Sequence, residues 1–167
     1  MYRDPIRRPF WSGIGRRKPD AYAEMVGGTS YPDIRGSVKF YETPAGVLVM
    51  AEVMGLPVSD ERCEMPIFAF HIHNGNSCED HGSEPFPKSG THYNPWGCPH
   101  PYHAGDLPPL FGVMGNAFSV FLTGRFQVRD VLGLTVMIHE GPDDFHTQPS
   151  GNPGAKIACG VIRPVRR

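Results

Sequence analysis

The chain has 167 residues, enough for one domain with its own core, and its 20 glycines and 18 prolines favour turns and loops over long helices. A formal net charge of −1 gives no overall bias toward nucleic acid or a membrane surface. No apolar run approaches the roughly 18 residues of a membrane span, and no apolar segment of signal-peptide type follows the basic N-terminus. We therefore expect a cytoplasmic protein if the chain is complete, and an extracytoplasmic one if a leader has been removed.

The first 33 residues are rich in proline, glycine and arginine and show no hydrophobic period. We interpret residues 1–33 as a basic N-terminal extension and residues 34–167 as the folded domain. The basic residues at both ends of the chain are expected to lie in solvated tails.

Six later segments have the alternation or the apolar composition of β-strands. They are residues 34–41, 47–56, 65–73, 117–128, 133–140 and 156–162. In the first segment Ile34, Val38 and Phe40 share a face, and a short turn with proline and glycine leads into the second, which predicts an antiparallel hairpin. The residues expected to share one face of the second segment are Val47, Val49, Ala51 and Val53.

Within residues 34–167 the two longest segments between predicted strands are residues 74–112 and 141–154, and loops of this length are usually functional. Strands joined by two such loops predict an all-β sandwich or barrel. All eight histidines lie beyond residue 70, in or near these loops.

His71 and His73 lie on one side of the third predicted strand, because side chains alternate along a strand. Phe68, Phe70 and Ile72 occupy the other side. His139 ends another predicted strand, so that two strand ends and a loop histidine can converge on one ion. Imidazole suits copper and zinc.

A second cluster is spaced by eight, three and three residues: His92, His100, His103 and Asp106. Three imidazoles and a carboxylate can form a tetrahedral zinc shell. Cys98 lies among them and could compete as a ligand.

Five pieces of the chain carry these residues in order: FHIH at 70–73, GTHYNP at 90–95, HAGDLP at 103–108, VMIHEGPDD at 136–144 and GNPGAKIACGVI at 151–162. Together they resemble the copper/zinc superoxide dismutase family, and its bacterial members most closely. The similarity runs from about Ile34 to Ile162. It implies an eight-stranded Greek-key β-barrel or sandwich with two long functional loops.

The resemblance also implies the metal sites. The positions that match copper ligands are His71, His73, His92 and His139, and those that match or stand near zinc ligands are His92, His100, His103 and Asp106. Asp143 matches the carboxylate that links one copper histidine to one zinc histidine. Cys78 and Cys159 match an intrachain disulfide.

Two residues are expected to act in catalysis. His92 matches the histidine that bridges copper and zinc and passes a proton to peroxide. Lys156 stands where the family carries an arginine that guides the superoxide anion. The positive charge is kept, but the rigid bidentate fork of arginine is lost.

The second cluster departs from the family pattern, in which these two histidines are usually farther apart, because His100 and His103 are only three residues apart. His81 and Cys98 are alternative zinc ligands to His100. Cys63 matches nothing in the family pattern, and we expect it to be a buried free thiol.

The resemblance therefore predicts an enzyme that dismutates superoxide with copper and zinc. The alternatives are a non-catalytic relative that binds zinc or stores or delivers copper, a zinc hydrolase, for which no HExxH motif exists, and a structural β-sandwich that docks through its basic arm. The expected partners are superoxide, a copper-delivery protein and a second copy in a homodimer, with neither nucleic acid nor a membrane span.

Overall fold

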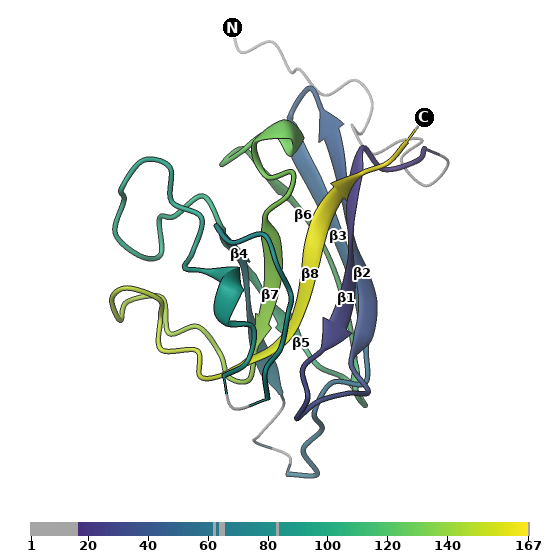
Figure 1. Ribbon diagram of the computed structural model, residues 1–167, viewed down its shortest axis with the longest axis vertical. Helices are drawn as coiled ribbons and strands as arrows, with labels where there is room; N and C mark the ends of the chain where they lie inside the picture. Colours follow the sequence, from purple (N-terminus) through teal and green to yellow (C-terminus); the bar gives the residue numbers. More distant parts are fainter. Residues whose placement is uncertain (1–16, 62, 64–65, 83, 167) are drawn as a thin grey trace, which may run out of the picture.

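The computed structural model describes residues 17–61, 63, 66–82 and 84–166. The strands are β1 (Ala21–Gly27), β2 (Arg35–Thr43), β3 (Gly46–Met54), β4 (Ile67–His73), β5 (Asp106–Phe111), β6 (Asn116–Thr123), β7 (Thr135–His139) and β8 (Lys156–Pro164) (Figure 1). Two short 3-10 turns are η2 (Pro87–Ser89) and η3 (Val128–Asp130). No helix in this part of the chain is long and apolar enough to cross a membrane.

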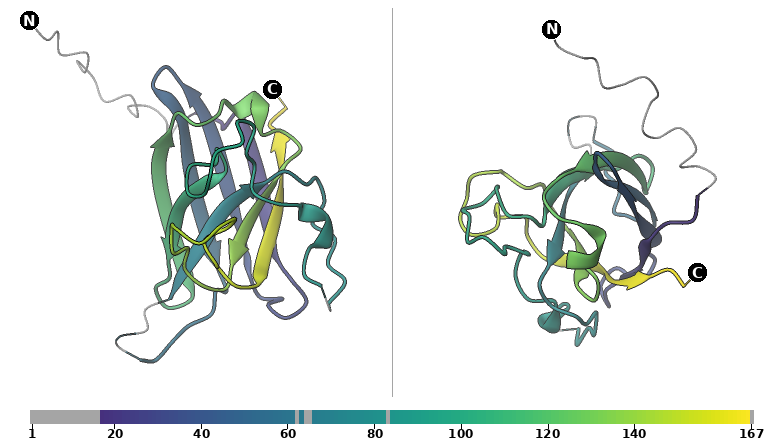
Figure 2. Two further views of the ribbon diagram at one scale, coloured as in Figure 1. Left: turned by 90° about the vertical axis from the view of Figure 1, so that its left-hand side faces the viewer. Right: turned by 90° about the horizontal axis from the view of Figure 1, so that it is seen from above.

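The strands form one sheet in the order β5-β4-β7-β8-β1-β2-β3-β6, and all paired neighbours are antiparallel. After the consecutive strands β4, β5 and β6, the chain returns to place β7 beside β4, which is a Greek-key connection. The sheet curls into a nearly closed barrel, which Figure 2 shows from above. The predicted all-β, eight-stranded fold is confirmed.

The barrel interior is filled by alternate residues of the strands. Phe68, Phe70 and Ile72 of β4 belong to one buried cluster with Val136 and Ile138 of β7. The residues predicted to share the inner face of the hairpin are all buried: Ile34, Val38, Phe40, Val47, Val49, Ala51 and Val53.

The expectation that residues 1–33 precede the folded domain is wrong for β1, which pairs with β2 on one side and β8 on the other. Ala21, Ala23 and Met25 point inward and are fully buried. Two of these three are alanines, whose small side chains give a weak hydrophobic alternation. Residues 1–16, which hold four of the six arginines and lysines of the predicted basic extension, lie outside the described residues.

The predicted loop 74–112 is shorter than expected, because its last part is β5. The sequence pattern does not predict this strand because it contains Pro108 and Pro109, and proline cannot donate a hydrogen bond to a neighbouring strand. β5 stands last in the hydrogen-bonded order, where missing donors are tolerated. The remaining loop and the one after β7 lie on the same side of the barrel (Figure 1), and β4 is almost entirely buried on both of its faces.

Candidate metal centre

The first cluster gathers on the outer side of β4 and β7. His71 and His73 alternate with the core residues of β4, and His139 ends β7. His92 arrives from the long loop and forms an isolated β-bridge with His73. We call His71, His73, His92 and His139 the histidine group: all four are buried, and one nitrogen from each lies within 4.8 Å of the others.

The second cluster contains His92 again, with His100, His103 and Asp106. We call these four residues the aspartate group; they are also buried, with ligand atoms within 4.8 Å of one another. Although His100 and His103 are only three residues apart in the sequence, both contribute a ligand atom to the aspartate group. Among the residues that the structure describes, His81 and Cys98 belong to neither group.

Asp143 connects the two groups. Its carboxylate accepts hydrogen bonds from His71 Nε2 at 2.9 Å and from His100 Nε2 at 2.8 Å. Burial raises the pKa of Asp143, but these bonds and one from the Phe145 amide outweigh it and bring the pKa to about 2. Because an ionised carboxylate can only accept, both imidazoles carry their proton on Nε2 and turn a lone pair on Nδ1 inward.

Backbone carbonyls fix two further imidazoles of the histidine group, those of His73 and His139. His73 Nδ1 donates to Gly90 O at 2.9 Å, and His139 Nδ1 donates to Gly154 O at 3.3 Å. The Nε2 atoms of His73 and His139 therefore each carry a lone pair, and the two atoms lie 3.3 Å apart. Burial lowers the pKa of both imidazoles, of His139 to about 3, so neither is protonated at neutral pH. Two facing lone pairs are best satisfied by a cation between them.

His92 belongs to both groups through its two nitrogens. Its Nδ1 lies 2.7 Å from Asp106 Oδ1 and 3.4 Å from His103 Nδ1, and its buried Nε2 has no hydrogen-bond partner. His71 Nδ1 and His100 Nδ1 are also buried without a hydrogen bond, although His100 Nδ1 is 3.1 Å from Asp106 Oδ2. Burial raises the pKa of Asp106, but the nearby imidazoles lower it by a larger amount. The pKa is therefore below its ordinary value, and the carboxylate is ionised.

The donor set fits metal ions. A tetrahedral site with bonds of about 2.0–2.1 Å to imidazole nitrogen has nitrogens roughly 3.3 Å apart, close to the 3.3 and 3.4 Å separations seen here. The histidine group offers imidazoles alone, which suit copper. The aspartate group offers three imidazoles and a carboxylate, which suit zinc.

Comparison with known proteins identifies the family of this chain. The family model of copper/zinc superoxide dismutase matches residues 34–162. The chain belongs to the copper/zinc superoxide dismutase family.

Curated relatives and a solved structure agree. The chain is 33% identical over 158 residues to superoxide dismutase [Cu-Zn] 2 of Aquifex aeolicus, with 86% of each chain covered. It is 35% identical over 136 residues to the superoxide dismutase [Cu-Zn] of Legionella pneumophila, with 77% of each covered. The Cu/Zn superoxide dismutase from Brucella abortus superposes with a TM-score of 0.69 at 26% identity, covering 84% of this chain and 98% of that one.

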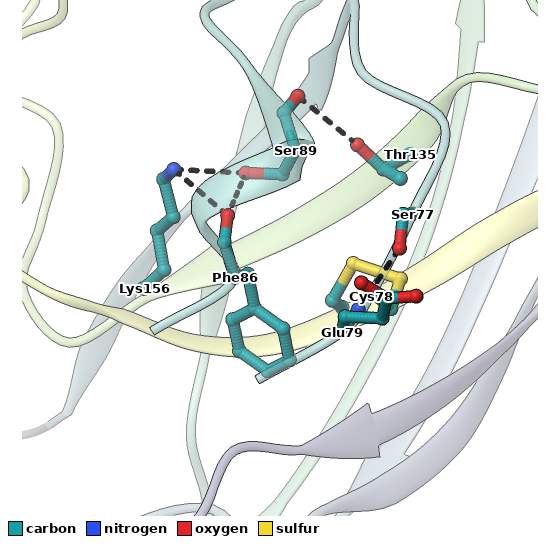
Figure 3. The surroundings of a disulfide bond; sticks show 8 residues. Ser77, Cys78, Glu79, Phe86, Ser89, Thr135 and Lys156 are labelled. Atoms are coloured by element: carbon teal, nitrogen blue, oxygen red, sulfur yellow. Dashed lines mark hydrogen bonds between the residues drawn. A yellow bond between two sulfur atoms is a disulfide. The ribbon is translucent and has the colours of Figure 1, made fainter. Parts of the chain in front are cut away.

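The disulfide implied by the family resemblance is present. Cys78 in the long loop is bonded to Cys159 in β8, 81 residues later. Figure 3 shows the bond beside Phe86 of the same loop. Cys63 and Cys98 are free; Cys63 is exposed rather than buried, which corrects the prediction, because it lies in the loop between β3 and β4 instead of inside a strand.

Lys156 lies beside the histidine group. With His73, His92 and His139 it lines a pocket of about 440 Å³. The pocket therefore borders three members of the histidine group. The ammonium does not extend into solvent but donates to Ser89 Oγ and Phe86 O.

Three residues that support the aspartate group were not found from the sequence. Arg125 Nη1 donates to the carbonyl oxygens of Pro101, His103 and Asp106 at 3.1, 3.0 and 3.1 Å. The side-chain amide of Gln148 accepts from His100 N at 2.9 Å and donates to His100 O at 2.7 Å. Both residues hold backbone atoms of the loop, a role that no ligand motif reveals.

Gly151 is the third. Its φ is +74°, and a Cβ there would lie 2.0 Å from Asp143 Oδ1 and 2.7 Å from His100 Nε2. A side chain at this position would displace the carboxylate that links the two groups.

Proposed function

We propose that the protein catalyses the dismutation of superoxide, in which two superoxide anions and two protons give oxygen and hydrogen peroxide. In this proposal the histidine group holds copper and the aspartate group holds zinc. The observation that carries it is His92, whose Nδ1 faces one group while its buried, unpartnered Nε2 faces the other. Membership of the copper/zinc superoxide dismutase family supports the same activity.

Bound copper would supply the one-electron couple that removes an electron from one superoxide and gives it to the next, whereas zinc has no redox chemistry of its own. The chain supplies the geometry for this exchange. Gly90 O and Gly154 O hold the imidazoles of His73 and His139 with their Nε2 lone pairs inward. Asp143 accepts hydrogen bonds from Nε2 of His71 and of His100, and so turns the Nδ1 lone pairs of both rings inward.

His92 is the proposed proton carrier. Peroxide formation consumes protons; His92 lines the pocket, and its Nε2 is buried and has no protein hydrogen bond. Its Nδ1 is held on the side of the aspartate group by Asp106. The ring can therefore take a proton on Nε2 and release it to the departing product while its orientation is kept.

Lys156 is the proposed guide for the anion. It lines the same pocket as three members of the histidine group, and its positive charge attracts a negatively charged substrate. A role only in copper storage or delivery is not favoured, because such a role needs neither a pocket open to a small anion nor a cation beside it.

The same proposal includes a copper-delivery protein as a partner and a homodimer as the assembly. The compartment is proposed to be cytoplasmic without a leader and extracytoplasmic with one. Sedimentation of the loaded protein measures the dimer directly.

The test measures copper and zinc content by mass spectrometry and superoxide consumption after loading with both metals. His139→Ala should lose copper and superoxide consumption, because it removes an Nε2 donor of the histidine group. His146→Ala is the matched control, since His146 is an exposed histidine of the following loop whose side chain bonds only Asp144 among the described residues. Absence of activity in the copper-loaded wild type, or full activity in His139→Ala, would overturn the proposal.

A further inference from the structure

The ammonium of Lys156 is turned onto the protein. Nζ donates to Ser89 Oγ at 2.8 Å and to Phe86 O at 3.3 Å, as Figure 3 shows. The side chain is half-buried, and burial lowers the pKa of Lys156. An ammonium has three N–H donors, so one remains for a ligand in the pocket that Lys156 lines.

Ser89 presents an acceptor to this ammonium. The residue is completely buried, and its hydroxyl donates its own hydrogen to Phe86 O at 2.8 Å. With that hydrogen engaged, the hydroxyl oxygen turns its lone pairs toward Lys156. The hydroxyl and the Phe86 carbonyl thus form a pair of acceptors aimed at one cation.

The backbone around Ser89 is held in place. Its carbonyl accepts from Gly75 N at 2.7 Å and from Thr135 Oγ1 at 3.5 Å. Gly75 has no room for a side chain, because a Cβ would lie 2.1 Å from Lys88 O. The turn that carries Ser89 is therefore fixed to the end of β4 and to β7.

The disulfide joins the same loop to the strand of Lys156. Phe86 packs with Met137 and Cys159, and with Cys78 at the edge of that cluster. Both acceptors of the ammonium therefore belong to a loop that is covalently attached to β8. The cation and its acceptors are fixed relative to each other.

A lysine at this position needs such support more than an arginine would. Guanidinium carries its donors in a rigid plane, whereas ammonium ends a flexible chain of four carbons. We propose that Ser89 is a positioning residue that, with the Phe86 carbonyl, holds the Lys156 ammonium at the pocket over the histidine group, where it captures anions. The inference rests on the proposed function for its physiological anion, superoxide, and on the pocket alone for anions in general.

The first test uses azide as the anion probe on the copper- and zinc-loaded protein, with binding followed by the visible absorption of copper. Loss of one supporting hydrogen bond to a charged group should weaken azide binding in Ser89→Ala by about tenfold to a hundredfold. Superoxide consumption at low ionic strength should fall by a similar factor. Ser77→Ala is the matched control, because this hydroxyl of the same loop accepts only from Glu79 N among the described residues and does not touch Lys156.

A double-mutant cycle separates positioning from folding. In a Lys156→Ala background, Ser89→Ala should change neither azide affinity nor superoxide consumption. A loss of the same size with and without Lys156 would show that Ser89 acts by shaping the loop, and would overturn the proposal.

The second test needs no metal. In the metal-free protein with ¹⁵N-labelled lysine, the Lys156 ammonium should give a slowly exchanging ¹H–¹⁵N signal, which Ser89→Ala should broaden and Ser77→Ala should leave intact. A wild type without this signal contradicts the proposal even if Ser89→Ala fails to fold. A loaded wild type that binds azide but consumes no superoxide overturns the proposed function instead, and the azide and ammonium measurements still decide the role of Ser89.

Discussion

A single carboxylate, Asp143, accepts hydrogen bonds from one imidazole of each group, His71 and His100. Its two oxygens set the tautomer of both rings and so decide which nitrogens point inward. Gly151 lies against it without a side chain, at a distance that only glycine permits. The geometry of the whole centre therefore depends on a residue that belongs to neither group.

Replacing Asp143 with asparagine should weaken metal binding. An amide keeps one acceptor and gains a donor, so one of the two imidazoles loses its partner and its preferred tautomer. We expect affinity for copper or zinc to fall by about 10- to 100-fold, measured by competition with a chelator. Asp144→Asn is the control, since the Asp144 carboxylate bonds only Thr147 and His146 of its own turn among the described residues. Equal affinities in both variants would contradict the role assigned to Asp143.

The residues that gather in the two groups could be predicted from the sequence, because their types and spacing form ordered motifs. The residues that hold those side chains could not. Gly90 and Gly154 act through carbonyl oxygens, and Arg125 and Gln148 act on the backbone of the loop. A carbonyl is common to every residue, so its role depends on where the folded chain places it.

At the scale of elements, the predicted strands were those with large apolar side chains in alternation. β1 was missed because alanine fills two of its inward positions, and β5 because two prolines interrupt it. Both strands form only through their neighbours: β1 lies between β8 and β2, and β5 pairs with β4. Long-range pairing determines these strands, and a local window cannot detect it.

Arg125 fastens the loop between β4 and β5 at the aspartate group. One nitrogen of its guanidinium meets the carbonyls of Pro101, His103 and Asp106. Arg125→Ala should lower the free energy of unfolding by about 2 kcal/mol, because it leaves three part-buried carbonyls without this charged donor. It should also weaken zinc binding, measured beside urea unfolding.

The control for Arg125 is Arg129→Ala, since the Arg129 side chain is 79% exposed and its ion pair with Asp130 spans 3.7 Å. A surface change of this kind alters stability by roughly 0.5 kcal/mol at most. If both variants unfold and bind zinc alike, Arg125 does not hold the loop.

At the scale of the whole molecule, the buried imidazoles tie folding to pH. Burial lowers the pKa of His71, His73 and His139 below the ordinary 6.5, in His139 to about 3. As the pH falls through 6.5, the unfolded chain takes up protons that the folded chain does not, so the metal-free protein should lose stability. With three such imidazoles the loss approaches about 4 kcal/mol per pH unit.

Urea unfolding of the metal-free protein between pH 7.5 and 5 measures this slope. His139→Gln should reduce it by about a third, since one of three titrating groups is removed. Asp106 and Asp143 also have a lowered pKa, so their contribution is lost at more acidic pH, below the ordinary value of 3.8. A midpoint that does not move between pH 7.5 and 5 would contradict the burial of neutral imidazoles.

The position of β8 has a consequence for how the molecule is made. This strand follows all the others in the sequence, yet in the sheet it lies between β7 and β1. Until β8 has been synthesised, β7 and β1 each lack one neighbouring strand, and Cys78 lacks Cys159, its disulfide partner. β8 brings the ladders to β7 and β1, the thiol of Cys159 and the ammonium of Lys156 beside the pocket. The two parts of the sheet, the disulfide and the cation of the pocket can therefore be joined only after β8 has been synthesised.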